Sequence, residues 1–443
     1  MRAAAVAAAD FNALTGSTRH TLPKRVLVIA PHSSYRTAAF LHAANQLEVE
    51  VLFASEGKYS VVSAHSDGLH IDMRDTANAL QTILREARHS PFAGVVGTDD
   101  ASTELAARVA QALSLPHNPP QAVRIARRKD LARACLAENG VPVPHHRRIN
   151  LLQSLVQQSG RVRFPCVLKP LNLSASRGVI RADNPDQFLK ACVRIKQLLI
   201  NEDVEERDYV LAEDFIPGAE FAVEGMLTGG ELNVLAIFDK PDPLDGPYFE
   251  ESYYTTPSRL ERAMQLQIRQ RVAEACSAYG LREGPVHAEC RTNDDGVWIL
   301  EVAARTIGGL CGRLLTFGTG YSLEELVLAH AMSHPLPHAT KRLGGGAGVL
   351  MIPTPTAGIL RRVEGLVAAQ NVPFIEEISI LVREGHPLVP WPEGSSYLGF
   401  IFARAPTPEQ AEAALRRAHA ELNFVAAPLW KLKQGTHYRS ERQ

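Results

Sequence analysis

Short apolar runs alternate with amphipathic helical stretches over the first part of the chain. "KRVLVIA" and "VEVLFAS" are compact apolar segments typical of buried strands, and a third run, "AGVVGTDD", ends in two aspartates. The strands and the helices between them are predicted, in chain order, at residues 24–30, 36–47, 49–55, 75–88 and 93–100. This βαβαβ order predicts a parallel, doubly wound α/β domain.

Ligands of a doubly wound sheet bind beyond the carboxyl ends of its strands. The residues placed there by the pattern are Pro31, His32, Glu56, Thr98, Asp99 and Asp100. Asp99 and Asp100 are acids at the end of an apolar strand, so they could pair with the ammonium group of an amino acid. We therefore expect both aspartates at a substrate site.

The pattern changes after residue 120. The helix "RKDLARACLAENG" ends at Gly140, a plausible cap before "VPVP", and two α/β segments follow. The last hundred residues are predicted as a small α+β appendage, and the glycine run at 344–348 as a flexible linker. The predicted units are an N-terminal tail at 1–23, a Rossmann-like domain at 24–120, a domain of two α+β subdomains at 121–340 with a lid at about 164–230, and the appendage at 341–443.

Composition narrows the class of protein. The 443 residues are 45% hydrophobic and 21% charged, with a formal net charge of −1, which gives no reason to expect nucleic acid or an anionic membrane as partner. The six cysteines form no CxxC pair, so a reducing cytoplasm is expected. No apolar run approaches the ~18 residues of a membrane span. The Ala-rich start favours a frayed tail, with a transit peptide as the alternative.

Two carboxylates stand in apolar strands in the second half of the chain. Val286–Cys290 and Val297–Ala303 are predicted to pair as a hairpin across "TNDDG". Glu289 lies in the first strand and Glu301 in the second, each between apolar neighbours. A charge in such a place is costly unless it meets a counter-ion or a metal. The pattern therefore indicates a cation site.

The stretch "FPCVLKPLNLSASRGVIRA" combines a strand-end lysine with a loop of small residues. Ser174, Ser176 and Gly178 would let backbone N–H groups approach an anion, while Lys169 and Arg177 add positive charge. Such a loop suits a polyphosphate. The alternative is a solvent-exposed loop after a strand. No GxxxxGK[ST] motif occurs, which excludes a P-loop nucleotidase.

A possible nucleotide hinge lies in "LAEDFIPGAEFAVEG". Glu213 and Glu220 stand on either side of a Pro-Gly break. Glu213 could accept a hydrogen bond from an exocyclic amine, backbone groups at Asp214 and Ile216 could contact a purine edge, and Glu220 could bind two ribose hydroxyls. The alternative is a pair of exposed acids beside a turn.

In combination these pieces resemble the ATP-grasp superfamily from about Lys24 to Pro337. The matching positions are the helix lysine Lys129, the strand-end lysine Lys169, a phosphate lid at 172–179, the hinge Glu213–Glu220, and the carboxylates Glu289 and Glu301. The resemblance implies ATP as co-substrate and two Mg²⁺ ions at Glu289 and Glu301, with Mn²⁺ as the alternative metal. It gives the fold class as α/β, with a doubly wound domain, an ATP-grasp domain and an appendage.

One departure points to a subgroup. Many ATP-grasp enzymes carry Glu-x-Asn on the second metal strand, whereas this chain reads Glu301-Val302-Ala303. "LEVAAR" is instead similar to the Glu-x-x-x-Arg form of the L-amino acid ligase group, as are "KPLNLSASRGVIRA", "PYFEESYYTTPSRL" and "ARTIGGLCGRLL". The appendage segment "EGLVAAQNVPFIEEISILVREGHPLV" resembles the C-terminal domain of these ligases. What would replace the missing Asn ligand stays open.

The resemblance implies a mechanism in which ATP phosphorylates a carboxylate and an amine then displaces phosphate. Arg305 would grip the acyl phosphate, with a structural pairing to Glu301 as the alternative, and Lys169, Gly308 and Gly309 would add donors. The expected substrate residues are His287, Asp99, Asp100 and Glu251. The partners would be two amino acids, with no nucleic acid or membrane and with a homodimer left open.

Two other functions stay open at this point. One is an ATP-grasp ligase of purine or carboxylation metabolism, and the other is a non-catalytic nucleotide-binding module. The echo of a zinc deaminase in "HAEC" lacks the required P-C-x-x-C, so zinc chemistry is not expected.

Overall fold

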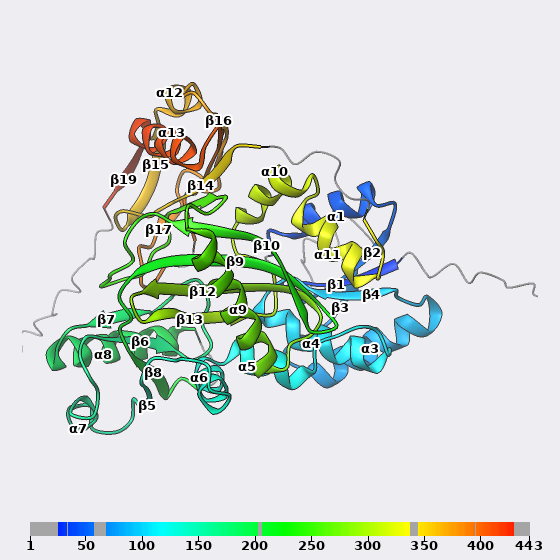
Figure 1. Cartoon of the computed structure of the whole chain (residues 1–443), viewed down its shortest axis with the longest axis horizontal. Coiled ribbons are helices and arrows are strands. Elements are labelled where there is room, and N and C mark those ends of the chain that lie inside the picture. Colours follow the sequence, from blue (N-terminus) through cyan, green and yellow to red (C-terminus); the bar gives the residue numbers. More distant parts are fainter. Residues whose placement is uncertain are drawn as a thin grey trace, which may run out of the picture.

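The computed structural model describes residues 25–32, 34–56, 68–202, 206–336, 344–394 and 396–428. Figure 1 shows a large central sheet with the N-terminal domain on one side, a small four-stranded unit below and the C-terminal unit above. The predicted tail at 1–23 lies outside the described residues. Within these described ranges, no helix combines the length and apolar character needed to cross a membrane.

The N-terminal domain has the predicted parallel sheet, in the strand order β3-β2-β1-β4. Its elements are β1 (Arg25–Ile29), α1 (Thr37–Gln46), β2 (Glu50–Ser55), β3 (Leu69–His70), α3 (Thr76–His89), β4 (Gly94–Gly97) and α4 (Asp100–Ala112). Strand β1 is buried throughout because helices cover both faces of the sheet, as expected for a continuous apolar run. Asp99 caps α4 by accepting from the Ala101 N–H, so the "DD" pair marks the start of this helix.

The four-stranded unit is an antiparallel sheet in the order β5-β8-β6-β7, and we call it the lid subdomain. Helices α5 (Pro120–Arg127) and α6 (Lys129–Glu138) lead into it, and its own elements are β5 (His146–Asn150), α7 (Leu155–Ser159), β6 (Cys166–Pro170), β7 (Ile180–Ala182), α8 (Pro185–Asn201) and β8 (Tyr209–Asp214). The subdomain thus runs from β5 to β8 rather than over 164–230. The chain leaves it at Gly218, whose positive φ of 119° and close approach to the Thr292 carbonyl leave no room for a Cβ.

The central sheet has the order β13-β12-β9-β10-β11-β14-β18-β16. Its strands are β9 (Ala219–Thr228), β10 (Glu231–Lys240), β11 (Tyr253–Thr256), β12 (Gly284–Asn293), β13 (Gly296–Ala303), β14 (Gly346–Ile352), β16 (Ile375–Ile380) and β18 (Gly399–Ala405). The hairpin β12–β13 turns at the predicted "NDDG". Helix α9 (Arg262–Tyr279) packs on β13 and β10, and its apolar face joins their core.

The C-terminal unit extends the same sheet, since β11 pairs with β14. It also holds β15 (Gly358–Glu364), α12 (Leu366–Gln370), β17 (Pro387–Leu388), α13 (Pro408–Glu421) and β19 (Asn423–Ala427), an α+β arrangement as expected. The glycine run at 344–348 is not a flexible linker, because it enters β14. A Cβ on Gly346 would lie 2.2 Å from the Pro408 nitrogen and one on Gly348 2.8 Å from Leu415, so the glycines allow α13 to pack on the strand.

One hydrophobic core joins the N-terminal domain, the central sheet and the C-terminal unit, whereas the lid subdomain has a core of its own. It contains β1 and β2 side chains, β9–β11 side chains, and residues of β14 and β18. Between β13 and β14, the chain passes through a 3₁₀ turn at Cys311–Leu315, α10 (Thr316–Thr319) and α11 (Leu323–Ala331). Residues of the 3₁₀ turn and of α11 also enter that core. The predicted α/β fold class is therefore confirmed, and the site described next lies where the units meet.

Candidate active site

A cavity of about 820 Å³ opens between the N-terminal domain, the lid subdomain, the central sheet and the C-terminal unit. The residues predicted for the nucleotide, the metal, the substrate and the acyl phosphate all line it except Arg177 and Gly178. The predicted residues that do so are Asp99, Asp100, Lys129, Lys169, Ser174, Ser176, Glu213, Asp214, Ile216, Glu220, Glu251, His287, Glu289, Glu301, Arg305, Gly308 and Gly309. Of the strand-end residues predicted near a ligand in the N-terminal domain, Pro31, Asp99 and Asp100 line it, whereas His32, Glu56 and Thr98 do not. Residues far apart in the sequence, from Asp99 to Gly309, thus converge on one space.

The loop at 172–179 forms one end of the cavity. Ala175 and Ser176 have left-handed backbone conformations, with φ of 57° and 54°, a geometry that directs successive N–H groups to a common side. Lys129 donates from Nζ to the Leu173 carbonyl (2.8 Å) and lies 3.5 Å from Glu301 Oε2. This end therefore combines a backbone concavity with a lysine, which suits an anion.

Arg177 and Gly178 of that loop were expected to face a polyphosphate, but neither lines the cavity. Arg177 binds Glu202 through two contacts of 2.6 and 3.0 Å, because the end of α8 presents this carboxylate beside the loop. Gly178 donates its N–H to the Pro392 carbonyl (2.9 Å), and a Cβ there would lie 2.8 Å from Pro170. The two residues hold the loop against its surroundings and do not face the cavity.

The first hinge glutamate is engaged by two cations. Glu213 is 3% exposed and lies 2.6 Å from Arg133 Nε and 2.7 Å from Lys169 Nζ. Burial alone would raise its pKa, but Arg133 and Lys169 outweigh this and hold the pKa at about 2. Its carboxylate is thus committed to an ion pair, and a role in accepting from a purine amine, which we expected, is not what this geometry favours.

Backbone groups of the hinge are also engaged. The Asp214 N–H donates to the His145 carbonyl (2.9 Å), and the Ile216 carbonyl accepts from Arg291 Nη1 (2.7 Å). The hinge still borders the cavity beside the apolar side chains of Val167, Phe215 and Leu300. A flat apolar ring would find contacts there.

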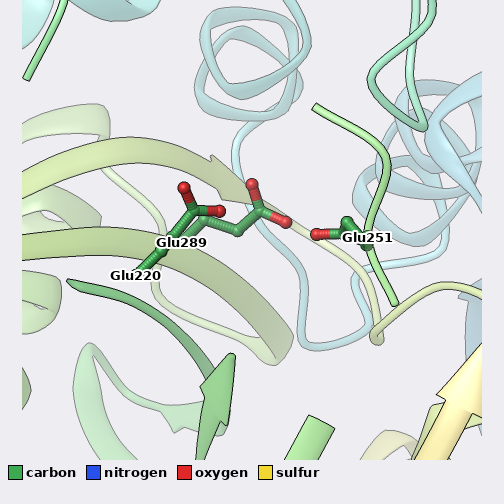
Figure 2. Close-up of side chains that lie close together, drawn as sticks. All are labelled: Glu220, Glu251 and Glu289. Carbon is green, nitrogen blue, oxygen red and sulfur yellow. The ribbon is translucent and has the colours of Figure 1, made fainter. Parts of the chain in front are cut away.

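Glu220, Glu251 and Glu289 turn their carboxylates toward one another (Figure 2). The Lys240 ammonium, which sequence reasoning did not single out, lies 2.8 Å from Glu220, 2.5 Å from Glu251 and 3.2 Å from Glu289. Although burial opposes it, these three carboxylates raise the pKa of Lys240 well above its ordinary value. Lys240 therefore occupies the position that a metal ion would take in this group.

The pKa values of Glu251 and Glu289 are shifted in opposite directions. Burial raises the pKa of Glu251 to about 6. The neighbouring Glu289 carboxylate also raises this pKa, whereas the Lys240 ammonium lowers it. Burial also opposes ionisation of Glu289, yet Lys240 and His287 lower its pKa well below the usual range. Glu289 is thus held as an anion by its two cationic neighbours.

Glu289 and Glu301 are direct cross-strand partners in the register of β12 and β13. Their side chains consequently share one face of the sheet, with Cβ atoms roughly 5 Å apart as for any such pair. Lys240 and His287 lie beside Glu289, and Lys129 lies beside Glu301. Two hard oxygen donors at this spacing fit a divalent ion.

Arg305 reaches across to the N-terminal domain. Its Nε lies 3.0 Å from Asp100 Oδ1, and its Nη1 donates to the Thr306 carbonyl (2.9 Å). Asp100 also accepts from Ser174 Oγ (2.6 Å), which ties the loop at 172–179 to the same carboxylate. Burial opposes both charges, yet their pairing raises the pKa of Arg305 and lowers that of Asp100. The partner of Arg305 is therefore Asp100 rather than Glu301.

A buried glutamate behind the site was missed from sequence. Glu224 is 0% exposed, accepts from the Ile307 N–H at 3.1 Å with each oxygen, and lies 3.2 Å from His287 Nδ1. Burial opposes protonation of His287, but Glu224 and Glu289 raise its pKa to about 9. Arg36, 6% exposed, contacts the same loop through the Ile307 carbonyl (2.6 Å). Glu224 and Arg36 thus fix the segment that follows Arg305.

Models of three domain families match the chain. The ATP-grasp N-terminal domain matches residues 41–117, the ATP-grasp domain residues 162–313, and the L-amino acid ligase C-terminal domain 2 residues 350–427. The three matches follow the order of the structural units along the chain. The match at 350–427 covers the unit that extends the central sheet.

Two relatives share sequence over long stretches. The uncharacterized protein y4rH of Sinorhizobium fredii is 23% identical over 94% of this chain and 86% of its own length. Dapdiamide A synthase of Enterobacter agglomerans is 25% identical over 58% of this chain and 60% of its own length. The match therefore spans somewhat more than half of the synthase.

The solved structures add a neighbour over nearly the whole chain. The L-amino acid ligase from Bacillus licheniformis aligns with a TM-score of 0.75 and 26% identity, covering 91% of this chain and 98% of the ligase. Phosphoribosylglycinamide synthetase from Anaerococcus prevotii aligns with a TM-score of 0.65 at 15% identity over 91% of this chain and 99% of the synthetase. The second likeness shows the shared fold alone.

Proposed function

Because this chain belongs to the ATP-grasp ligases, which form carbon–nitrogen bonds, we propose that it joins the carboxyl group of one amino acid to the amino group of another and makes a dipeptide. The observation that carries this proposal is one cavity in which the loop at 172–179, the Glu289–Glu301 pair and Arg305 meet. These are the parts that phosphoryl transfer to a carboxylate and attack by an amine require. We call the loop at 172–179 the phosphate loop.

The nucleotide fits between the lid subdomain and the sheet. The loop at 172–179, Lys129 and Lys169 suit the triphosphate, and the apolar walls of the hinge suit the base. Glu220 suits the ribose hydroxyls, although Lys240 and Arg291 hold it in this structure. ATP would therefore have to share these contacts with the protein's own cations.

The divalent metal fits Glu289 and Glu301, whose oxygens are the hard ligands that Mg²⁺ prefers, with Mn²⁺ as the alternative. Bound there, the metal would neutralise phosphate oxygens. Ala303, at the position of the further Asn ligand of related enzymes, offers no side-chain oxygen. Water or a second oxygen of Glu301 would take that coordination place.

The chemistry of our proposal runs in two steps. The substrate carboxylate attacks the γ-phosphorus, giving an acyl phosphate and ADP, and the amine then attacks the acyl carbon, so that phosphate leaves and an amide remains. Arg305 Nη2 would stabilise the developing oxyanion, since Nε and Nη1 are engaged by Asp100 and Thr306. Backbone N–H groups of Gly308 and Gly309 border the same space.

The substrate ammonium group has Asp99 as its partner in this proposal. Asp100 is committed to Arg305 and Ser174, whereas Asp99 accepts from Thr98 Oγ1 (2.9 Å) and the Ala101 N–H at the start of α4. Burial raises the pKa of Asp99, and a ligand cation would offset that cost. His287 and Glu251 line the cavity nearby as further substrate residues.

The experiment is a screen of paired L-amino acids with ATP and Mg²⁺, scored by phosphate release and product mass. We expect substrate-dependent phosphate release with a product lighter by one water than the two amino acids together. Release that depends on bicarbonate or on a phosphoribosyl amine, with no amino acid product, would instead favour the carboxylation or purine alternative. ATP binding with no turnover in any pairing would contradict the proposal.

A further inference from the structure

The phosphate loop is held from outside by the C-terminal unit. Trp391 donates from Nε1 to the Ala175 carbonyl (3.1 Å), and the Pro392 carbonyl accepts from the Gly178 N–H (2.9 Å). Both contacts fall within the eight residues 172–179. The loop is thus bonded at its middle and near its end to a segment more than two hundred residues away.

A third contact holds the rest of the lid subdomain to the same segment. Glu393 accepts from Arg194 of α8 through two contacts of 2.5 and 2.7 Å, and Arg194 also contacts the Tyr248 hydroxyl. Arg194 and Glu393 are partly exposed, so this pair alone would contribute little. Residues 391–393, which we call the latch, therefore act mainly through their bonds to the loop backbone.

The latch also leads to the substrate end of the cavity. The Trp391 ring packs on Tyr397 with centroids 5.1 Å apart, and Tyr397 packs on Phe400 at 6.1 Å. Tyr397 and Phe400 line the same cavity as Arg305, and Phe400 lies against Gly309, whereas Trp391 is 5% exposed and does not line it. Packed aromatic rings of this kind transmit small displacements because they leave little free space.

We propose that Trp391 is a positioning residue that holds the phosphate loop in its anion-binding conformation and couples this loop to occupancy of the substrate pocket. The inference rests on the proposed ligase function, because it assigns the two ends of the coupling to ATP and to an amino acid. A substrate that presses on Tyr397 shifts the Trp391 ring, and the ring carries the Ala175 carbonyl with it.

The loop needs such support for a physical reason. Ala175 and Ser176 stand in left-handed conformations that are unfavourable for residues other than glycine. An external hydrogen bond to the Ala175 carbonyl favours this conformation over the relaxed alternatives. The same hydrogen bond gives the buried Trp391 N–H an acceptor, and leaving this donor without one would cost free energy.

The test compares two tryptophans that each donate one hydrogen bond. Trp391→Phe keeps a ring against Tyr397 and removes the donor, and the matched control Trp298→Phe removes the Nε1 bond to Asn293 Oδ1 (3.2 Å) on the β12–β13 hairpin. We expect Trp391→Phe to raise the KM for ATP about fivefold, as expected for one neutral hydrogen bond, with little change in the KM for amino acids. Trp298→Phe should keep the parent KM for ATP and the parent KM for amino acids.

Hydrogen exchange of residues 172–179 supplies a second readout. With a non-hydrolysable ATP analogue, the parent should gain protection in this loop, and added amino acid should increase it further. Trp391→Phe should lose the nucleotide-dependent protection in part, and Tyr397→Leu should lose only the increment caused by the amino acid.

The outcomes separate this inference from the proposed function. If the parent makes no amide with any pair, the ligase proposal fails, while nucleotide protection of the loop and its loss in Trp391→Phe can still be measured. Parent-like KM for ATP and parent-like exchange in Trp391→Phe would overturn the positioning role. An equal loss in Trp391→Phe and Trp298→Phe would also overturn it, since the effect would then be general destabilisation.

Discussion

Arg305 and Asp100 form an ion pair of 3.0 Å between the strand end of the central sheet and the first helix turn of α4. Because Ser174 of the loop at 172–179 bonds the same aspartate, one partly buried carboxylate connects three units of the molecule at the site. Arg305 is therefore oriented before substrate arrives. Such pre-orientation lowers the barrier of a reaction that depends on placing positive charge at a developing oxyanion.

Replacing Arg305 should separate ATP binding from amide synthesis. Arg305→Ala should bind ATP nearly as well as the parent and lose amide synthesis about a hundredfold, a barrier change of roughly 3 kcal/mol, because the guanidinium meets the acyl group. Arg305→Lys should rescue poorly, since a point charge does not reproduce a planar grip. Calorimetry measures the ATP affinity of each variant, and mass spectrometry measures its amide product. Parallel loss of ATP affinity and activity would show that Arg305 serves the nucleotide or the fold.

Glu301→Gln should weaken the metal site and leave the fold intact. Glu301 is partly exposed and faces Lys129 at 3.5 Å, so the amide fits without burying a new charge. Amide synthesis should fall by two orders of magnitude or more at ordinary Mg²⁺ concentrations, and higher Mg²⁺ should restore part of it. Glu274→Gln, on α9 away from the cavity, is the matched control. Near-parent turnover in Glu301→Gln would exclude this glutamate as a metal ligand.

The Glu213 ion pair should make stability depend on acid pH. Its folded-state pKa of about 2 lies below the ordinary 4.5, so its contribution is present above pH 4.5 and is lost as the pH falls through about 2. The pH-dependent part is about 3 kcal/mol. Denaturant unfolding of the parent and Glu213→Gln should show this difference at pH 7 and a much smaller one near pH 2.5. A difference that does not change with pH would mean that Glu213 is not held as an anion.

The carboxylate pair could be predicted because a charge in an apolar strand is visible in the sequence, as at Glu289 and Glu301. The same physical rule applied to Glu224 and Lys240, which stand in β9 and β10, so the pattern contained a signal for them too. The run of small residues after Lys169 likewise indicated the loop at 172–179, which borders the cavity. It did not predict which side chains turn inward, and Arg177 turns to Glu202 because α8 ends there.

Other features depend on contacts that no local pattern encodes. Arg36 meets Ile307 across 271 positions of the chain, and Trp391 meets Ala175 across 216. The ion pair of Glu213 with Arg133 likewise forms only because the fold brings α6 next to β8 of the lid subdomain. The glycine run at 344–348 looked like a linker because glycine both loosens a chain and permits close packing, and only the position of α13 distinguishes the two.

Glu224→Gln should reduce turnover without reducing ATP affinity. Glu224 uses both oxygens on the Ile307 N–H, one residue beyond Thr306 and two beyond Arg305, while Arg36 holds the Ile307 carbonyl from the other side. Glutamine keeps the shape but offers a single acceptor oxygen and turns an N–H₂ group toward one of its partners. The loop after Arg305 should then shift by a fraction of an ångström, enough to lower kcat about tenfold, because oxyanion stabilisation depends on position.

Two comparisons check this cause. Glu231→Gln, at the exposed start of β10, is the matched control and should keep parent kinetics. In a double variant, Glu224→Gln should cost little more once Arg305→Ala is present, because the positioning of an absent guanidinium no longer matters. If the two effects on kcat multiply instead, Glu224 acts on turnover by a route that does not pass through Arg305.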